Sequence, residues 1–206
     1  MASPSHCSLH RLEQHWRELQ AIGVAVPEVI GFKPRISNLA EGGTNTAEFA
    51  EEVAIAAAAA AHRARERGTP PLRMACQTGF NAGVSALALL CALPNAMVHS
   101  FDLGVHPYVV PAARLLDRDY FGRHKLTLGS SLETLPAMHR NLTSPGARVP
   151  YCDYVFVDGG HSFDVAMADL RNFRSLTTPK TTVVVENCNA STVPPVLKPN
   201  GASVCW

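Results

Sequence analysis

The chain contains little charge and no excess of either sign. Only 17% of its 206 residues are charged, and 18 Lys and Arg residues against 17 Asp and Glu residues give a formal net charge of +1. This balance gives no indication of a nucleic-acid partner, because nucleic-acid-binding domains are usually basic. No apolar run approaches the roughly 20 residues that span a bilayer, so no membrane is indicated. The first residues also lack the apolar core of a secretory signal, which leaves the cytoplasm as the default location.

CxxC spacing is absent as well. The six cysteines are Cys7, Cys76, Cys91, Cys152, Cys188 and Cys205. Several of them lie inside apolar runs, which is typical of reduced thiols buried in a core. We therefore expect reduced cysteines in a reducing compartment rather than disulfides.

The chain is long and apolar enough, at 47% hydrophobic residues, for one domain with a sizeable core. We expect an N-terminal helical extension over residues 1–70, a core over 71–190 and a short irregular tail over 191–206. Helices are predicted at Leu9–Ala21 and Ala47–Arg67. The alanine run of the second helix either lets it lie close against a sheet or reflects helix propensity alone.

From Leu72 onward, strand and helix patterns alternate. The predicted strands are Leu72–Cys76, Val98–Asp102, Lys125–Leu128, Tyr154–Asp158 and Thr182–Glu186. The helical stretches between them are Gly83–Leu93, Pro107–Tyr120, Ser131–Asn141 and Phe163–Leu176. Short apolar strands separated by helices predict an α/β fold with a doubly wound, mostly parallel sheet.

The polar ends of these strands predict a nucleoside pocket. The first strand is followed by the turn TGFNAG, with Gly79 and Gly83, and the second ends on Asp102, 23 residues after Gly79. Glycines let the backbone approach a ligand, and an acid at the neighbouring strand end can accept hydrogen bonds from a ribose diol. The turn is not GxGxxG, which disfavours a nicotinamide-dependent enzyme.

Five motifs in order resemble those of the class I S-adenosylmethionine-dependent methyltransferases. They are CQTGFNAGVSALALL for the first cofactor motif, SFDLGVHPYV for the ribose-binding strand, LGSSLETLP for the third-strand turn, FVDGGHSFDVAMADL for the fourth strand and VVVENC for the fifth. The fourth motif is similar to that of the small-molecule, catechol-type O-methyltransferase branch. The resemblance implies a Rossmann-like fold and methyl transfer from S-adenosylmethionine to an oxygen or nitrogen of a small molecule.

The same resemblance implies a set of cofactor-binding residues. They are Gln77, Gly79, Phe80, Asn81 and Gly83 around the methionine moiety and sugar, Asp102 at the ribose hydroxyls, Ser130 and Ser131 near the adenine, and Asp158. Two positions depart from the family pattern, because Gln77 and Ser130 stand where the family usually has acids. A neutral amide is a weaker partner for a cationic sulfonium. A catalytically inactive binding or scaffold protein of this fold is therefore the alternative.

Asp158, Glu186 and Asn187 resemble the Mg²⁺ ligands of catechol-type O-methyltransferases, with Glu186 in place of an Asp. Oxygen ligands suit Mg²⁺ or another divalent cation, which could bind substrate oxygens and lower a hydroxyl pKa. His161, in the same loop as Asp158, is a candidate general base, and Asp158 a second catalytic candidate. The alternative is structural, with Asp158 capping the next helix, Asn187 in a turn and His161 orienting its loop.

The predicted C-terminal part of the sheet is incomplete. Three prolines after Asn187 exclude a regular helix there, and Ala202–Trp206 offers at most one short strand. We expect the fifth strand to lie near an open edge, which would favour a homodimer through that edge.

Overall fold

A computed structural model of the chain describes residues 4–23, 46–143, 152–160, 162–186 and 203–205. Its strands form one sheet in the order β3-β2-β1-β4-β5-β6, and every pairing between neighbours is parallel. The strands are β1 (Met74–Thr78), β2 (Met97–Asp102), β3 (His124–Leu128), β4 (Cys152–Val157), β5 (Thr177–Val185) and β6 (Ser203–Cys205). This confirms the predicted α/β fold with a doubly wound sheet.

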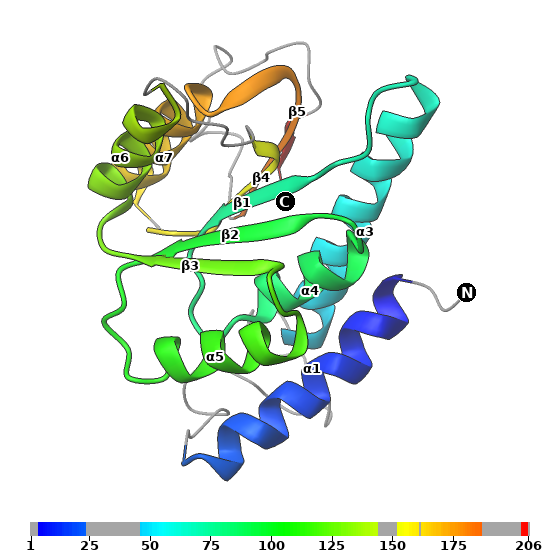
Figure 1. The fold of residues 1–206 in the computed structure, drawn as a ribbon, viewed down its shortest axis with the longest axis vertical. Helices are drawn as coiled ribbons and strands as arrows, with labels where there is room; N and C mark the ends of the chain where they lie inside the picture. Colours follow the sequence, from blue (N-terminus) through cyan, green and yellow to red (C-terminus); the bar gives the residue numbers. More distant parts are fainter. Residues whose placement is uncertain (1–3, 24–45, 144–151, 161, 187–202, 206) are drawn as a thin grey trace, which may run out of the picture.

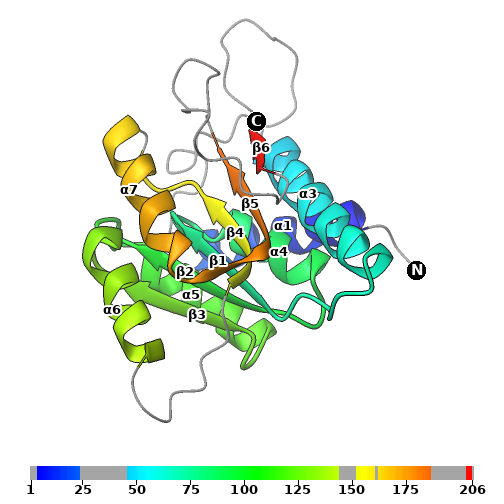
Figure 2. The ribbon, with the colours of Figure 1, turned by 90° about the horizontal axis from the view of Figure 1, so that it is seen from above.

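Helices cover both faces of the sheet (Figures 1 and 2). They are α1 (Pro4–Ala21), α3 (Thr46–Glu66), α4 (Val84–Ala92), α5 (Val109–Asp119), α6 (Ser131–Thr143) and α7 (Phe163–Arg174). One face carries α6 and α7, and the other carries α3, α4 and α5, with α1 packed against these three helices. None of these helices, within the residues described, is long and apolar enough to cross a membrane.

The two faces enclose two separate cores, because successive strand residues point to opposite sides. Ala75 and Val98 join the core beneath α4, whereas Cys76 and Val155 join the core beneath α6 and α7. In α4, eight of nine residues are buried, since this helix packs against the sheet and against helices α1 and α3. The alanines of α3 accordingly pack on α1 and α4, where small side chains permit close helix contact.

Each predicted strand is displaced at one or both ends, and β1 and β5 show the largest differences. β1 starts at Met74 rather than Leu72 and continues through Thr78, so Gln77 lies inside the strand and is fully buried. β5 starts at Thr177, five residues earlier than expected, with an irregular register opposite Cys152 and Tyr154. The first residues of this strand are polar threonines, and apolar runs, by which strands are predicted, begin only after them.

The fifth strand is not an open edge over its last residues. β6 pairs with it from Val183↔Ser203 to Val185↔Cys205, so β6 is the edge of the described sheet and the fifth strand lies next to that edge, as expected. The predicted short C-terminal strand is confirmed, and a homodimer stays a prediction.

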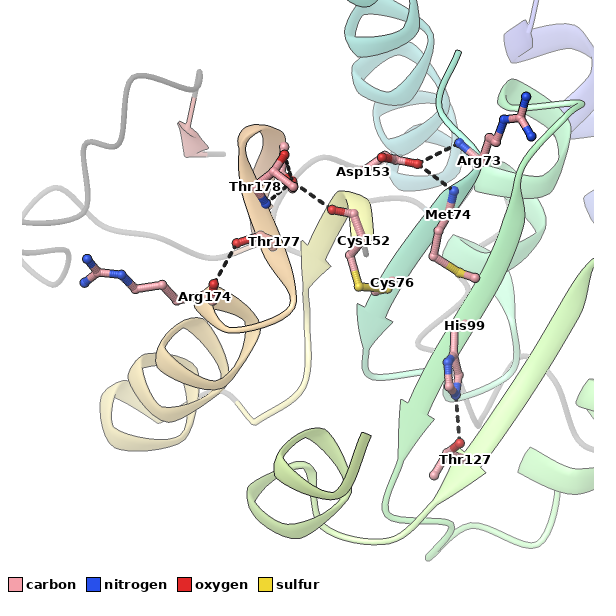
Figure 3. Close-up of a disulfide and its surroundings, with 11 residues drawn as sticks. Arg73, Met74, Cys76, His99, Thr127, Cys152, Asp153, Arg174, Thr177 and Thr178 are labelled. Atoms are coloured by element: carbon pink, nitrogen blue, oxygen red, sulfur yellow. Dashed lines mark hydrogen bonds between the residues drawn. A yellow bond between two sulfur atoms is a disulfide. The ribbon is translucent and has the colours of Figure 1, made fainter. Parts of the chain in front are cut away.

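The expectation of reduced cysteines is wrong for Cys76 and Cys152. These residues form a disulfide between neighbouring strands β1 and β4, with a Cα–Cα distance of 5.7 Å (Figure 3). Cys91 is also disulfide-bonded, and no described cysteine is free. Sequence spacing does not indicate this pairing, because the two partners lie 76 residues apart and meet only when β4 lies beside β1. The inference of a reducing compartment therefore loses its basis.

Replacing both Cys76 and Cys152 with alanine should lower the free energy of unfolding by about 4 kcal/mol. The bridge closes a loop of 76 residues, and a loop of that length removes about this much chain entropy from the unfolded state. Chemical denaturation of the double variant and wild type measures the difference. Thiol titration in denaturant provides the control, since free thiols at both positions without reductant would contradict the bridge.

His99 is buried in β2. Its Nε2 lies 2.8 Å from Thr127 Oγ1, and its ring stacks on Phe101 at 4.3 Å between centroids. Burial, and then the charges of Lys125 and His124, lower the pKa of His99 to about 4.

Because this pKa lies below the unfolded value of 6.5, His99 binds its proton more readily in the unfolded chain. Its contribution to stability is therefore present above pH 6.5 and is lost as pH falls toward 4. We expect His99→Gln to remove roughly 3 kcal/mol of the pH dependence of unfolding in this window. Denaturation curves of wild type and His99→Gln at pH 7 and pH 4.5 test this. An equal loss of unfolding free energy between the two pH values in both proteins would contradict it.

Candidate functional site

The carboxyl ends of the strands meet around one cavity, at the point where the strand order reverses between β1 and β4. Such a switch point is where open α/β sheets bind ligands. Backbone bonds continue the ladder past the strand ends, from Gly79 N to Phe101 O at 2.9 Å and from Asp158 N to Thr78 O at 3.1 Å. The cavity has a volume of about 560 Å³, within the usual range for a small-molecule pocket.

The turn after β1 is held in a conformation that glycine favours. Gly79 has a φ of 81°, Asn81 of 51° and Gly83 of 85°. A Cβ on Gly79 would lie 1.9 Å from the backbone oxygen of Asp158. Gly79 is therefore required both by its dihedral angle and by the close approach of the loop that follows β4.

Asp102 holds this turn through its carboxylate. Its Oδ2 accepts hydrogen bonds from the backbone N–H groups of Phe80 and Asn81, both at 2.9 Å, and its Oδ1 accepts one from Gly104 at 2.7 Å. A carboxylate offers about four acceptor positions. The three bonds leave roughly one position for a ligand hydroxyl, so Asp102 is part of the turn as well as of the cavity wall.

Most of the predicted site residues line the cavity. They are Gly79, Phe80, Asn81, Asp102, Ser130, Ser131, Asp158 and Glu186. Gly83 and Gln77 are not among the lining residues. Gly83 is the N-cap of α4, where a Cβ would lie 3.0 Å from the Phe80 ring, and Gln77 is buried behind the turn. His161 and Asn187 lie outside the described residues.

Asp158 and Glu186 form a carboxyl pair at neighbouring strand ends. Burial, followed by the charge of Glu186 and a hydrogen bond with it, raises the pKa of Asp158 to about 8. The pair therefore retains a proton near neutral pH. Asp158 does not cap the next helix, because Ser162 is the N-cap of α7 and accepts from Val165 N.

Asp158 and Glu186 fit a divalent cation in charge and in donor type. No described His, Cys, Asp or Glu completes a group of three around them. The third expected ligand, Asn187, lies outside the described residues, and the cation stays a prediction.

Asp169 lies behind the cavity; it belongs to the fourth motif but was not among the expected site residues. It is fully buried on α7, and a Cβ on Gly159 would lie 3.0 Å from its Oδ2 and 3.1 Å from Thr78 Oγ1. Burial raises the pKa of Asp169, while the hydroxyls of Ser131 and Thr78 act in the opposite direction. The carboxyl thus lies where β1, α6 and the loop after β4 meet.

His15 connects the N-terminal helix to the turn. Its Nε2 donates to the carbonyl oxygen of Ala82 at 2.8 Å, and the residue is only 3% exposed. No sequence pattern predicts this contact, because the two residues lie far apart in the chain. α1 therefore supports the wall of the cavity directly.

A family model described as a methyltransferase domain matches residues 76–188, which is more than half of the chain. The chain belongs to this methyltransferase family. The match begins in β1 and covers every strand end that lines the cavity, so the family assignment and the site geometry concern the same residues. A search of curated proteins gives no match.

Among solved structures, this methyltransferase-family chain is similar to the S-adenosylhomocysteine-bound methyltransferase PaMTH1 of Podospora anserina. The identity is 18% and the TM-score 0.52, over 82% of this chain and 58% of PaMTH1. The O-methyltransferase TomG of Streptomyces achromogenes, solved with S-adenosylmethionine, is 24% identical, with a TM-score of 0.43 over 63% of this chain and 64% of TomG. The chain spans less than two thirds of the length of either protein. The first likeness supports the Rossmann-like methyltransferase fold.

Proposed function

We propose that the chain binds S-adenosylmethionine in the cavity at the β1 and β4 ends and transfers its methyl group to a small-molecule acceptor. The observation that carries the proposal is the glycine turn bound to Asp102 at adjoining strand ends. This arrangement occurs within the segment that matches the methyltransferase family. The oxygen or nitrogen nature of the acceptor follows from the resemblance of the fourth motif to the small-molecule branch.

The described residues fit a nucleoside ligand. Asp102 retains about one acceptor position for a ribose hydroxyl, and exposed Leu103 and Val105 give the adjoining wall an apolar surface. When bound, S-adenosylmethionine supplies an electrophilic methyl whose C–S bond breaks with its electron pair going to sulfur. The chain contributes chiefly by aligning the acceptor with that methyl and by excluding water.

Deprotonation of the acceptor is assigned to the side chains at the β4 and β5 ends. With a pKa near 8, Asp158 holds a proton at neutral pH and can act as the base only in the ionised fraction, which grows as the pH rises past 8. His161 is the second candidate base from the sequence. If a divalent cation replaces the shared proton, Asp158, Glu186 and Asn187 would hold it and orient the acceptor oxygens.

Transfer of labelled methyl from S-adenosylmethionine to a panel of hydroxyl and amine acceptors tests the proposal. We expect turnover on at least one acceptor in wild type and none in Asp102→Ala. Such turnover would exclude an inactive scaffold, whereas S-adenosylmethionine binding without transfer to any acceptor would favour it.

Chelation separates the two routes for deprotonation. Activity that EDTA abolishes and Mg²⁺ restores would support the cation at Asp158 and Glu186. Activity that is unchanged by EDTA would assign proton removal to the carboxyl pair or His161. The Glu186→Gln variant provides the control, because its response to Mg²⁺ should be weaker in the first case only.

A further inference from the structure

A chain of buried polar side chains runs behind the glycine turn and crosses three strands. Gln77 on β1 donates from Nε2 to Ser100 Oγ on β2 at 3.1 Å. Ser100 Oγ lies 3.3 Å from His124 Nε2 on β3. His124 Nδ1 lies 2.9 Å from Asp117 Oδ1 on α5. The chain thus connects an exposed carboxylate, with 55% of its side chain accessible, to a fully buried amide.

The hydrogen bonds of this chain have one consistent direction. An ionised Asp117 can only accept, so His124 carries its proton on Nδ1, and Nε2 of the neutral ring accepts from the Ser100 hydroxyl. Ser100 Oγ in turn accepts from the Gln77 amide. The Oε1 atom of Gln77 is buried without a hydrogen-bond partner in the described part of the chain. While His124 is neutral, no other direction of donation satisfies the hydrogen bonds among Asp117, His124 and Ser100.

His124 also touches the turn itself. The Phe80 ring stacks on the His124 imidazole, with 5.2 Å between centroids and 30° between planes. Phe80 lines the cavity, and its backbone N–H is one of the donors to Asp102. The chain therefore reaches the turn at two points, through the Phe80 ring and through Gln77, two residues before Gly79.

We propose that Asp117, His124 and Ser100 act as positioning residues that fix Phe80 and Gln77, and with them the cofactor turn. This inference rests on the proposed function, because the turn is taken as the site of S-adenosylmethionine. None of the three residues lines the cavity, and their effect is exerted through the side chains that they hold.

Protonation of His124 would disturb this arrangement. Nε2 would become a donor to Ser100, and the serine hydroxyl hydrogen would need a new acceptor, which only a rotated Gln77 amide presents within the chain. Burial lowers the pKa of His124, and the hydrogen bond to Asp117 opposes this shift. His99 on β2 is a further titratable group coupled to the ring, because the charge of His124 contributes to lowering the pKa of His99. The affinity for the cofactor should therefore fall as the pH is lowered below 7.

The test is calorimetric titration with S-adenosylhomocysteine from pH 5.5 to 8, using variants outside the cavity. Asp117→Asn keeps an acceptor for Nδ1–H but removes the charge that stabilises the imidazolium. We expect its affinity to equal that of wild type near pH 8. The fall of affinity at acidic pH (the acid limb) should begin at a lower pH in this variant than in wild type. Ser100→Ala interrupts the chain and should weaken binding by about 3- to 10-fold at neutral pH. Asp119→Asn, the same change two residues further along α5 and outside the chain, is the control.

One outcome would overturn the positioning role alone. In it, wild type binds the ligand, but Asp117→Asn and Ser100→Ala show the same affinity and the same pH dependence as the control Asp119→Asn. If wild type does not bind at any pH, the proposed function fails, and the positioning role fails with it. If Ser100→Ala does not fold, Asp117→Asn decides the matter, because its side chain is exposed. Titration of the His124 imidazole by NMR supplies the independent readout, with its midpoint expected to follow the acid limb in wild type and in Asp117→Asn.

Discussion

Gly79→Ala is expected to abolish binding of S-adenosylhomocysteine and to lower the free energy of unfolding by about 3 kcal/mol or more. The new Cβ would lie 1.9 Å from the backbone oxygen of Asp158 and 2.6 Å from its carbonyl carbon. Backbone atoms cannot rotate away as a side chain can, so the turn after β1 or the loop after β4 must move. Either movement would displace the N–H groups that Asp102 binds. Calorimetric titration and chemical denaturation measure the two effects.

Gly122→Ala is the matched control for Gly79→Ala. Gly122 has a φ of 73°, close to the 81° of Gly79, but an added Cβ there would meet nothing within 4 Å. This variant therefore carries only the cost of a left-handed alanine, about 1–2 kcal/mol, and should bind the ligand as wild type does. Equal behaviour of the two variants would show that the close approach to Asp158 does not matter.

Asp102→Ala is expected to weaken binding of S-adenosylhomocysteine by about 100-fold or more and to cost about 2–4 kcal/mol in stability. The carboxylate accepts from the backbone of Phe80, Asn81 and Gly104. Its removal leaves these N–H groups without their acceptor and removes the proposed partner of the ribose. Binding should therefore fall further than the loss of one ligand contact alone would predict.

Asp153→Ala separates stability from binding in this experiment. The Asp153 carboxylate also accepts backbone hydrogen bonds, from Arg73 at 2.8 Å and Met74 at 3.0 Å (Figure 3). It lies at the amino end of β1, away from the cavity. We expect a comparable loss of stability with unchanged affinity, and a similar loss of affinity in both variants would mean that Asp102 acts only through the stability of the fold.

The fold and the position of the site could be predicted because both depend on local patterns. Apolar runs with a polar residue at each carboxyl end identify the strands of a parallel sheet, and right-handed crossovers bring those ends to one edge. This reasoning placed Gly79, Asp102 and Asp158 together, and the structure confirms that they line one cavity.

The remaining features depend on pairings between distant segments. The disulfide joins Cys76 to Cys152 because β4 lies beside β1, which the spacing of the two cysteines does not reveal. The contact of His15 with Ala82 depends likewise on the packing of α1. Gln77 was expected in the cofactor site, but β1 extends past it, and its side chain points instead to Ser100. A shift of two residues in a strand end was enough to change the surroundings of that side chain.

Titration of the wild-type chain with S-adenosylhomocysteine, and then with S-adenosylmethionine, tests the central claim most directly. The claim is that the cavity beside Gly79 and Asp102 is the cofactor site. We predict saturable binding of both compounds, competition between them, and loss of both in Gly79→Ala and Asp102→Ala. The absence of binding to either compound at millimolar concentration, in a folded protein with its disulfide intact, would contradict the claim.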